Sequence, residues 1–484
     1  MNLAQWSPDK PLRVVDLRNS LQVAALFNDY SPSVSTPPPA SAAFGKVVEH
    51  GIALGASTAV VEHRYLDPDW RSEHAAFYSK TFRRYPGVAH RLHFFAAVFD
   101  GPADDGGAYD PPFEDLGYLG YSVLRPLPVA PVGRTVLPPL DADRDSLKCW
   151  MIDEITLFGH TLRITGAPFI SGDGQLGGCG HATVWTTAYY HHKETLLPRQ
   201  LPASIASWAA QGVALGRPPQ PGALTVYQLH AAFAGTGLDP LYYDLETLDP
   251  AEDRHALICR YLDSGLPVTV ASGNHTYVLI GYRDRAEGAP EYFAQDDECG
   301  PYEYRDLPEP HPETNTSVYV VIPLPSKVFL PGEYASAIAE QFLSEEANKG
   351  RTEQAKDLFR TLLKGEHSFR TLLLPSNVFK ARAARRYPAD LAAALRYHPM
   401  PRWLWVVQAV VDGGVVAEAL VDATQRQDDP HLLAWWLPGE ASLWLPDEDD
   451  YDVVPLASFG PLPLLVPGLP DSPAGAPPGL AGGG

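Results

Sequence analysis

Hydrophobic positions in the middle of the chain recur first at helical spacing and then run together as they do in strands. Helices are predicted over residues 202–211, 225–234 and 252–264. Strands are predicted over residues 268–271, 275–282, 292–295 and 318–322. Because the helices come first and the strands second, the pattern indicates an α+β fold rather than a wound parallel sheet.

The residues on either side of this centre have patterns of their own. Before it, residues 59–65 and 120–126 are strand-like and residues 73–82 are helical, which indicates a small α/β domain of unknown role. After it, residues 334–348 have the spacing of an amphipathic helix, and strands are predicted beyond them at 403–408 and 414–419. The C-terminal part is therefore expected to be a further α+β domain.

A chain of 484 residues is too long for one ordinary domain, and the pattern divides it into parts. The proline-rich start is expected to be extended and mobile, and the tail of Pro, Gly and Ala to be disordered. The expected parts are the N-terminal segment 1–43, the small α/β domain 44–146, the central domain 147–325, the C-terminal domain 326–461 and the tail 462–484.

Composition narrows the class of protein. The formal net charge of -21 argues against nucleic acid or an anionic membrane surface as the main partner. No run approaches the ~18 apolar residues that cross a bilayer, so no membrane insertion is expected. The four cysteines make no disulfide framework, and the N-terminus shows no signal peptide. We therefore expect a cytoplasmic protein with reduced thiols, and its abundant Ala, Pro and Arg are typical of GC-rich bacterial genomes.

One cysteine stands in a context that favours reactivity. Cys179 follows Gly177 and Gly178 and precedes an apolar, aromatic run that predicts a helix, so its thiol is placed on the first helical turn. A cysteine attacks as its thiolate, which the partial positive charge of a helix N-terminus and a nearby imidazolium both stabilise. The other cysteines lack this context, and we interpret them as inert thiols.

Further along the chain lie residues of the types that a thiol nucleophile needs. His275 begins one predicted strand and is the candidate base, and Asp296 ends the next strand and is the candidate for orienting the imidazole. Asp297 is the alternative to Asp296, because a slip of one residue turns a strand side chain to the opposite face. Gln175 is the candidate donor of a side-chain amide to the oxyanion, together with the backbone N–H of Cys179.

These residues resemble the papain-like cysteine peptidases, and within them the bacterial branch of double-glycine, bacteriocin-processing leader peptidases. In that branch a Gln precedes a Cys-Gly pair that opens a helix. A Gly-x-Pro-Val strand precedes a His that starts a Val-x-x-Gly-Tyr strand, and an Asp lies near a following Gly. The resemblance covers the middle of the chain and neither flank. The matching residues here are Gln175, Cys179-Gly180, Gly265-Leu266-Pro267-Val268, His275, Val278-Leu279-Ile280-Gly281-Tyr282, Asp296 and Gly300.

The resemblance implies a papain-like central domain, with a helical part and an antiparallel sheet. It also implies a cysteine peptidase that cleaves a peptide or isopeptide bond of a protein or peptide substrate through a thioester at Cys179. His275 would act as base and then acid, Asp296 would orient it, and no cofactor would be needed. Gln175 lies nearer to the cysteine than its counterpart does in the family, and His181 stands where proline is common.

Two other functions would use the same residues. An acyltransferase, as in transglutaminase-like and phytochelatin-synthase-like enzymes, would pass the acyl group to an amine or a thiol instead of water. A non-catalytic module would keep the fold and bind a peptide or protein. A metal site is not expected, because the chain has no CxxC or HExxH spacing and zinc would occupy the thiol. The sequence identifies neither the substrate nor the oligomeric state.

Overall fold

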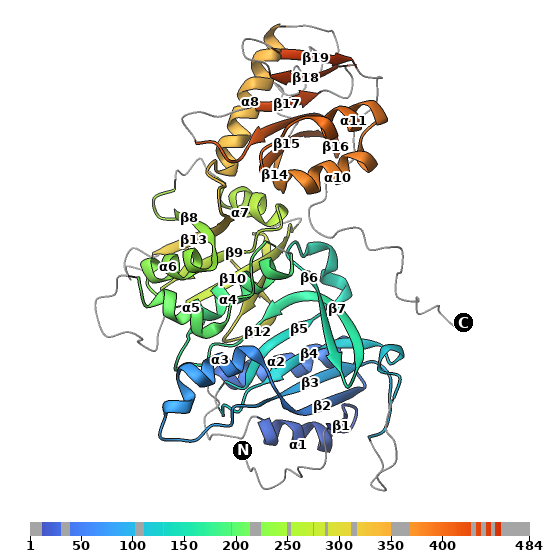
Figure 1. The fold of residues 1–484 in the computed structure, drawn as a ribbon, viewed down its shortest axis with the longest axis vertical. Coiled ribbons are helices and arrows are strands. Elements are labelled where there is room, and N and C mark those ends of the chain that lie inside the picture. The colour runs from blue at the N-terminus through green and yellow to red at the C-terminus, as the bar shows by residue number, and fades with distance from the viewer. Residues whose placement is uncertain are drawn as a thin grey trace. The chain divides into compact units, whose positions relative to one another are not determined.

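The computed structural model divides the chain into two compact units (Figure 1). The first unit runs to Ser326 without Asp263–Gly265, and the second comprises those residues and the chain from Lys327. The structure describes residues 12–30, 39–101, 111–128, 130–194, 196–212, 224–248, 253–273, 275–285, 289–310, 317–349, 368–426, 432–436, 442–446 and 451–455. Within these ranges no helix is both long and apolar enough to cross a membrane.

The described strands form three sheets, and every strand pair in them is antiparallel. Along the chain, each of the three groups of strands is interspersed with helices. The combination of helices with purely antiparallel sheets confirms the expected α+β class.

The first sheet has seven strands in the order β1-β2-β3-β4-β5-β7-β6. They are β1 (Leu12–Asp16), β2 (Thr58–Tyr65), β3 (Ala89–Phe95), β4 (Tyr118–Leu124), β5 (Val132–Leu137), β6 (Met151–Leu157) and β7 (His160–Phe169). The helices of this region are α1 (Ser20–Tyr30), α2 (Pro39–Ala53) and α3 (Pro68–Ala76). The interior strand β3 is buried along its whole length, whereas the edge strand β6 buries alternate residues, as expected of a strand with one face covered.

The second sheet, which the same unit contains, has six strands in the order β12-β11-β10-β9-β13-β8. They are β8 (Leu238–Asp244), β9 (Val268–Ser272), β10 (His275–Arg283), β11 (Glu291–Asp296), β12 (Gly300–Arg305) and β13 (Val318–Pro325). The helices are α4 (Cys179–Lys193), α5 (Pro202–Ala209), α6 (Val226–Thr236) and α7 (Arg254–Asp263). Helix α4 packs against β10, α5 and α6 and is buried along most of its length. This burial fixes the position of its first turn.

The third sheet lies in the second unit and follows chain order, β14-β15-β16-β17-β18-β19. Its strands are β14 (Ser368–Pro375), β15 (Trp403–Val411), β16 (Gly414–Asp422), β17 (Leu432–Trp436), β18 (Ser442–Pro446) and β19 (Tyr451–Pro455). The helices are α8 (Gly332–Lys349), α10 (Ser376–Arg386) and α11 (Ala389–Tyr397). Apolar residues of α10 and α11, such as Phe379 and Leu391, are buried with Val406 and Trp436 of the sheet. This unit therefore has a core of its own.

The first sheet does not follow the expected division of the chain. Strands β6 and β7 lie beyond the boundary expected between residues 146 and 147, yet β7 pairs with β5 and extends the sheet. The phenol of Tyr302 in β12 donates to the Leu137 carbonyl at 2.6 Å and accepts the Ala167 N–H at 2.8 Å. These bonds tie the second sheet to the first, so the expected small domain 44–146 and the central domain share one unit.

The expected N-terminal segment also differs from the structure in part. Residues 12–30 lie within the segment 1–43 but form β1 and α1, because β1 pairs with β2 and gains the ladder hydrogen bonds that an isolated strand lacks. The two units divide after Ser326, next to the boundary expected after residue 325. The tail 462–484 lies outside the described residues.

Candidate functional site

The loop before α4 is tied to a buried carboxylate. Asp173, which is 7% exposed, accepts the backbone N–H groups of Gln175, Leu176 and Gly177 at 2.6–3.2 Å. The phenol of Tyr78 donates to its Oδ2 at 2.6 Å. A carboxylate that accepts several N–H bonds holds a turn in one conformation, so α4 begins at a fixed point. The sequence gives no local signal for this role, because Asp173 lies outside the motifs around Cys179, His275 and Asp296.

The next residue of the loop is bound by a histidine of α4. The N–H of Gly178 donates to Nδ1 of His181 at 3.2 Å. Burial lowers the pKa of His181 to about 4, although the Asp173 charge acts in the opposite direction. His181 is therefore neutral at physiological pH and accepts this hydrogen bond at the helix N-terminus. Cys179, the first residue of α4, is 7% exposed.

Two neighbouring strands bring the predicted base and its partner together. His275 begins β10 and Asp296 ends β11, and these strands pair in the register Val278–Gln295. Nε2 of His275 lies 3.0 Å from Oδ2 of Asp296. The hydroxyl of Thr183 in α4 donates to the Thr276 carbonyl at 3.2 Å, which holds the cysteine-bearing helix beside the histidine-bearing strand.

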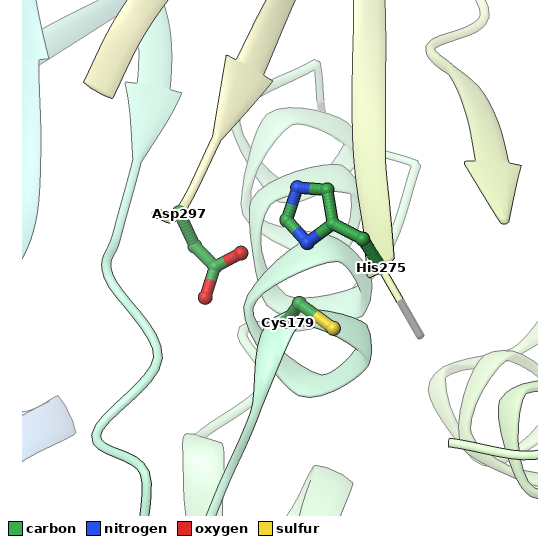
Figure 2. A group of neighbouring side chains, drawn as sticks. All are labelled: Cys179, His275 and Asp297. Carbon is green, nitrogen blue, oxygen red and sulfur yellow. The ribbon is translucent and has the colours of Figure 1, made fainter. Parts of the chain in front are cut away.

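The thiol of Cys179 and the imidazole of His275 lie at one place with the carboxyl group of Asp297. One possible ligand atom of each residue lies within 4.8 Å of the other two. Figure 2 shows the three side chains facing one another, with Cys179 on the first turn of its helix. Nε2 of the histidine is bound to Asp296, and Nδ1 is buried without a hydrogen bond to nitrogen or oxygen, with Oε1 of Glu298 3.9 Å away. Nδ1 is therefore the nitrogen available to the thiol.

The charges around His275 favour its protonated form. Burial lowers the pKa of His275, but the hydrogen bonds to Asp296 and Cys179 and the charge of Asp296 outweigh burial and raise the pKa to about 11, with a smaller contribution from Asp297 when that group is ionised. Burial raises the pKa of Asp296, but the hydrogen bond from His275 and the charges of His275 and Arg305 bring it below its usual range. An imidazolium between a carboxylate and a thiol stabilises the thiolate.

Asp296 is held by more than the histidine. It is fully buried, it forms an ion pair with the Arg305 guanidinium of β12, and its Oδ1 accepts the backbone N–H groups of Glu298 and Cys299 at 3.1 and 3.3 Å. These bonds fix the carboxylate, and through it the His275 ring. Arg305 has no signal in the sequence as a site residue, because the pairing of β11 with β12 is what brings its guanidinium to Asp296.

Asp297 also lies beside the cysteine–histidine pair, but its partners differ from those of Asp296. Its Oδ2 accepts the Gly172 N–H at 3.2 Å, and its Oδ1 is buried without a hydrogen-bond partner. Burial raises its pKa to about 7, with the Asp296 charge acting in the same direction and the His275 charge opposing it. The adjacent aspartates that the sequence left as alternatives thus both lie at the site, in different environments.

Gln175 is the predicted site residue that the structure does not bring to the others. Its side chain is exposed, and in the described part of the chain no hydrogen bond links it to Cys179, His275 or Asp296. The loop directs its backbone N–H, rather than its side-chain amide, to Asp173. The fourth expected residue is therefore placed on the surface of the loop.

Among the described residues, Cys179, His275 and Asp297 are a group close enough to hold a metal ion. Two observations count against that use. An imidazolium has no free lone pair, and the surroundings of His275 favour its protonated form. A bound cation would also lie at the helix N-terminus, where the partial charge is positive. The arrangement suits thiol chemistry better than metal binding.

Comparisons with known proteins leave the family of this chain open. No family model matches it, and no curated protein or solved structure matches it either.

Proposed function

We propose that this protein is a cysteine hydrolase that cleaves a peptide or isopeptide bond through a thioester at Cys179. The observation that carries the proposal is the placement of His275 between two partners. Its Nε2 faces the Asp296 carboxylate at 3.0 Å, and its Nδ1 is buried on the side of the thiol. Nucleophile, base and orienting group in contact are the arrangement that thiol hydrolases need.

The proposed reaction begins with the Cys179 thiolate and the His275 imidazolium. The sulfur attacks the substrate carbonyl carbon, and the carbonyl electron pair moves to oxygen. When the tetrahedral intermediate collapses, His275 gives its proton to the leaving amine and a thioester remains. His275 then takes a proton from water, the resulting hydroxide attacks the thioester, and the thiolate leaves. Asp296 holds the ring in place and stabilises its charge in both half-reactions.

The proposal extends to a papain-like arrangement of the region from α4 to β13. A helix whose first residue is the nucleophile packs against an antiparallel sheet whose strands carry the histidine and the aspartate. This agrees with what the resemblance implies for the centre of the chain. The flanking strands of the first sheet and the second unit have no counterpart in that resemblance, and we propose that they select the substrate.

The test is the pH dependence of Cys179 alkylation by iodoacetamide, followed peptide by peptide by mass spectrometry. Wild-type Cys179 is expected to react at pH 6 at least ~10-fold faster than Cys259, because the imidazolium favours its thiolate. His275→Ala should slow the labelling of Cys179 by roughly 100-fold.

The chain offers a matched control for this measurement. Cys259 Sγ lies 3.3 Å from Nε2 of His255, one helical turn away in α7, so it is a second cysteine beside a histidine but not at a helix N-terminus. His255→Ala should leave Cys179 labelling unchanged. If Cys179 reacts no faster than Cys259, and His275→Ala changes nothing, the hydrolase proposal fails and a binding module is favoured. If Cys179 is activated, products formed with added amine distinguish acyl transfer from hydrolysis.

A further inference from the structure

The two adjacent aspartates at the site have different surroundings. Asp296 is bound by His275, by Arg305 and by two backbone N–H groups. Asp297 has no cationic partner in a salt bridge within the described residues, and its one hydrogen bond comes from the Gly172 N–H. When two carboxyl groups in one site have such different environments, they commonly have different protonation states and different roles.

The absence of a side chain at Gly172 leaves room for the Asp297 carboxyl group. A Cβ atom at Gly172 would lie 2.7 Å from Asp297 Oδ2 and 3.2 Å from the backbone carbon of Gly178. No side chain other than hydrogen fits there without a shift. The Gly172 N–H binds Oδ2 at 3.2 Å, which leaves the buried Oδ1 without a hydrogen-bond partner, and one oxygen of this carboxyl group lies within 4.8 Å of the thiol and the imidazole. A buried oxygen without a partner is unusual, and a substrate group is one way to supply that partner.

Besides the backbone N–H of Cys179, the site needs a second donor to the oxyanion, and the loop does not provide one. The N–H groups of Gln175, Leu176 and Gly177 are bound to Asp173, and that of Gly178 is bound to His181. The Gln175 side chain, which was expected to donate, is exposed on the loop. The donors immediately before Cys179 are thus already used inside the protein.

We propose that Asp297 is a further catalytic residue, a neutral carboxylic acid whose Oδ1–H donates a hydrogen bond to the substrate carbonyl oxygen as it becomes an oxyanion. This rests on the proposed thioester chemistry at Cys179. As the Sγ–carbon bond forms and the carbonyl electron pair moves to oxygen, the Asp297 proton stays on Asp297 and stabilises that charge. His275 keeps its own proton for the leaving group, so each proton has one role.

The surroundings of Asp297 agree with a neutral acid. The titratable groups that face it are the His275 imidazole, the Asp296 and Glu298 carboxylates and the Cys179 thiol. Burial raises its pKa to about 7, above the usual value for an aspartate, with Asp296 and Glu298 acting in the same direction against His275. The acid form therefore declines as the pH rises through about 7, and oxyanion stabilisation should decline with it.

The experiment compares two reactions of Cys179 in the full-length chain. Acylation by p-nitrophenyl acetate passes through an oxyanion, whereas alkylation by iodoacetamide does not. Asp297→Ala should slow acylation by roughly 100-fold and alkylation by less than threefold. Asp297→Asn keeps an N–H donor, so its acylation should stay within about tenfold of wild type and lose the decline above pH 7. Release of p-nitrophenolate and the mass of the acetyl-protein give both rates.

The outcomes separate this inference from the proposed function. If wild-type Cys179 shows no activation in alkylation, the proposed function itself fails. If alkylation is activated but Asp297→Ala is acylated as fast as wild type, the hydrolase proposal stands and the role of Asp297 is overturned. Equal losses in Asp297→Ala and Asp297→Asn would also overturn it, as would a wild type that is alkylated rapidly but not acylated. Circular dichroism of each variant excludes unfolding as the cause.

Discussion

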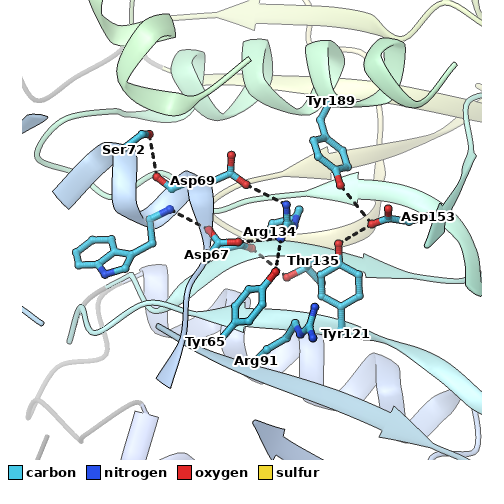
Figure 3. A network of polar contacts seen from close by, with 12 residues as sticks. Tyr65, Asp67, Asp69, Ser72, Arg91, Tyr121, Arg134, Thr135, Asp153 and Tyr189 are labelled. Carbon is cyan, nitrogen blue, oxygen red and sulfur yellow. Dashed lines mark hydrogen bonds and ion pairs between the residues drawn. The ribbon is translucent and has the colours of Figure 1, made fainter. Parts of the chain in front are cut away.

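Helix α4 joins two clusters of buried charge, and the first of them is closed. On the first sheet and its neighbouring loops, Arg134 pairs with Asp67 at 2.8 Å, and Asp153 accepts the phenol of Tyr189 from α4 at 3.3 Å (Figure 3). Lys193, in the last turn of α4, lies 2.5 Å from the same aspartate. Each of these carboxylates has a cation beside it, and Asp153 is 1% exposed. Among the residues drawn in Figure 3, the network contains no thiol.

The second cluster, at the other end of the same helix, is open. The His275 side chain is 28% exposed, its Nδ1 is on the side of the thiol, and the buried Oδ1 of Asp297 has no hydrogen-bond partner. The nucleophilic Cys179 lies beside both. Burial and perturbed ionisation occur in both clusters, so neither identifies a site by itself. Both clusters also contain a buried atom without a hydrogen-bond partner, Nε of Arg134 in the first and Oδ1 of Asp297 in the second. What distinguishes the second cluster is the nucleophilic thiol of Cys179 beside that atom, while the first cluster anchors the helix that carries the thiol.

The largest expected effect falls on the closed network. Asp153→Ala removes the acceptor of Tyr121 at 2.6 Å, of Tyr189 and of the Lys193 ammonium. Breaking a buried pair in this way costs about 3–5 kcal/mol of unfolding free energy. Urea unfolding should show that loss, while Cys179 in the molecules that remain folded should be alkylated at the wild-type rate.

Asp153→Asn is the control for this variant, since it keeps an oxygen for the phenols and removes only the charge. It should lose less stability than Asp153→Ala. The interpretation of the first cluster as an anchor would be wrong if either variant left the unfolding free energy unchanged and slowed the alkylation of Cys179 instead. That result would make the network part of the reactive site rather than its anchor.

The next effect falls on the open cluster and is one of rate. Asp296→Asn removes the charge that raises the pKa of His275, so that pKa should fall from about 11 towards its ordinary value of 6.5. At pH 8 the imidazole of the variant would be mostly neutral, so the Cys179 thiolate would lose its cationic partner. A thiol with an ordinary pKa of about 8.5 is still partly ionised at this pH, and alkylation of Cys179 should therefore slow by roughly fourfold. Wild-type His275 should stay protonated through pH 9, which a histidine NMR titration measures directly.

The raised pKa of His275 also makes the stability of the folded protein depend on pH. The folded pKa of His275 lies above the unfolded value, so its contribution is complete below about pH 6.5 and is lost as the pH rises towards 11. The wild type should therefore lose stability relative to Asp296→Asn over that alkaline range. A wild-type His275 that titrates near pH 6.5 would contradict the proposed ion pair and the sign of this effect.

The sequence was sufficient to find the residues whose local context carries a signal. Cys179 stands between glycines and an apolar helix, and His275 and Asp296 stand at strand ends, so their places in the elements were predictable. Asp173 and Arg305 were not, because their partners depend on a loop conformation and on strand pairing across distant positions. The choice between Asp296 and Asp297 could not be made from the sequence. The alternation of side chains along a strand predicts which face each one lies on, but not which group it contacts there.

The strands that belong to the first sheet could not be predicted from the sequence either, because their pairing also depends on distant positions. Strand β6 (Met151–Leu157) was not among the elements predicted from the sequence, although the structure buries its alternate residues. Nothing in that pattern says that β7 turns back to pair with β5, or that β1 closes the opposite edge on β2. Sheet membership is a long-range property, since a strand pattern fixes its faces and not its neighbours.

The smallest expected effect concerns Gln175, which belongs to neither cluster. Its side chain is exposed, and the bond that holds its residue in the loop comes from its backbone N–H. Gln175→Ala should therefore change unfolding free energy by less than about 0.5 kcal/mol, and acylation and alkylation of Cys179 by less than twofold. A tenfold loss of acylation alone would mean that the loop rearranges to bring Gln175 to the oxyanion. In that case the open cluster would have a second donor, and Asp297 would not supply the hydrogen bond by itself.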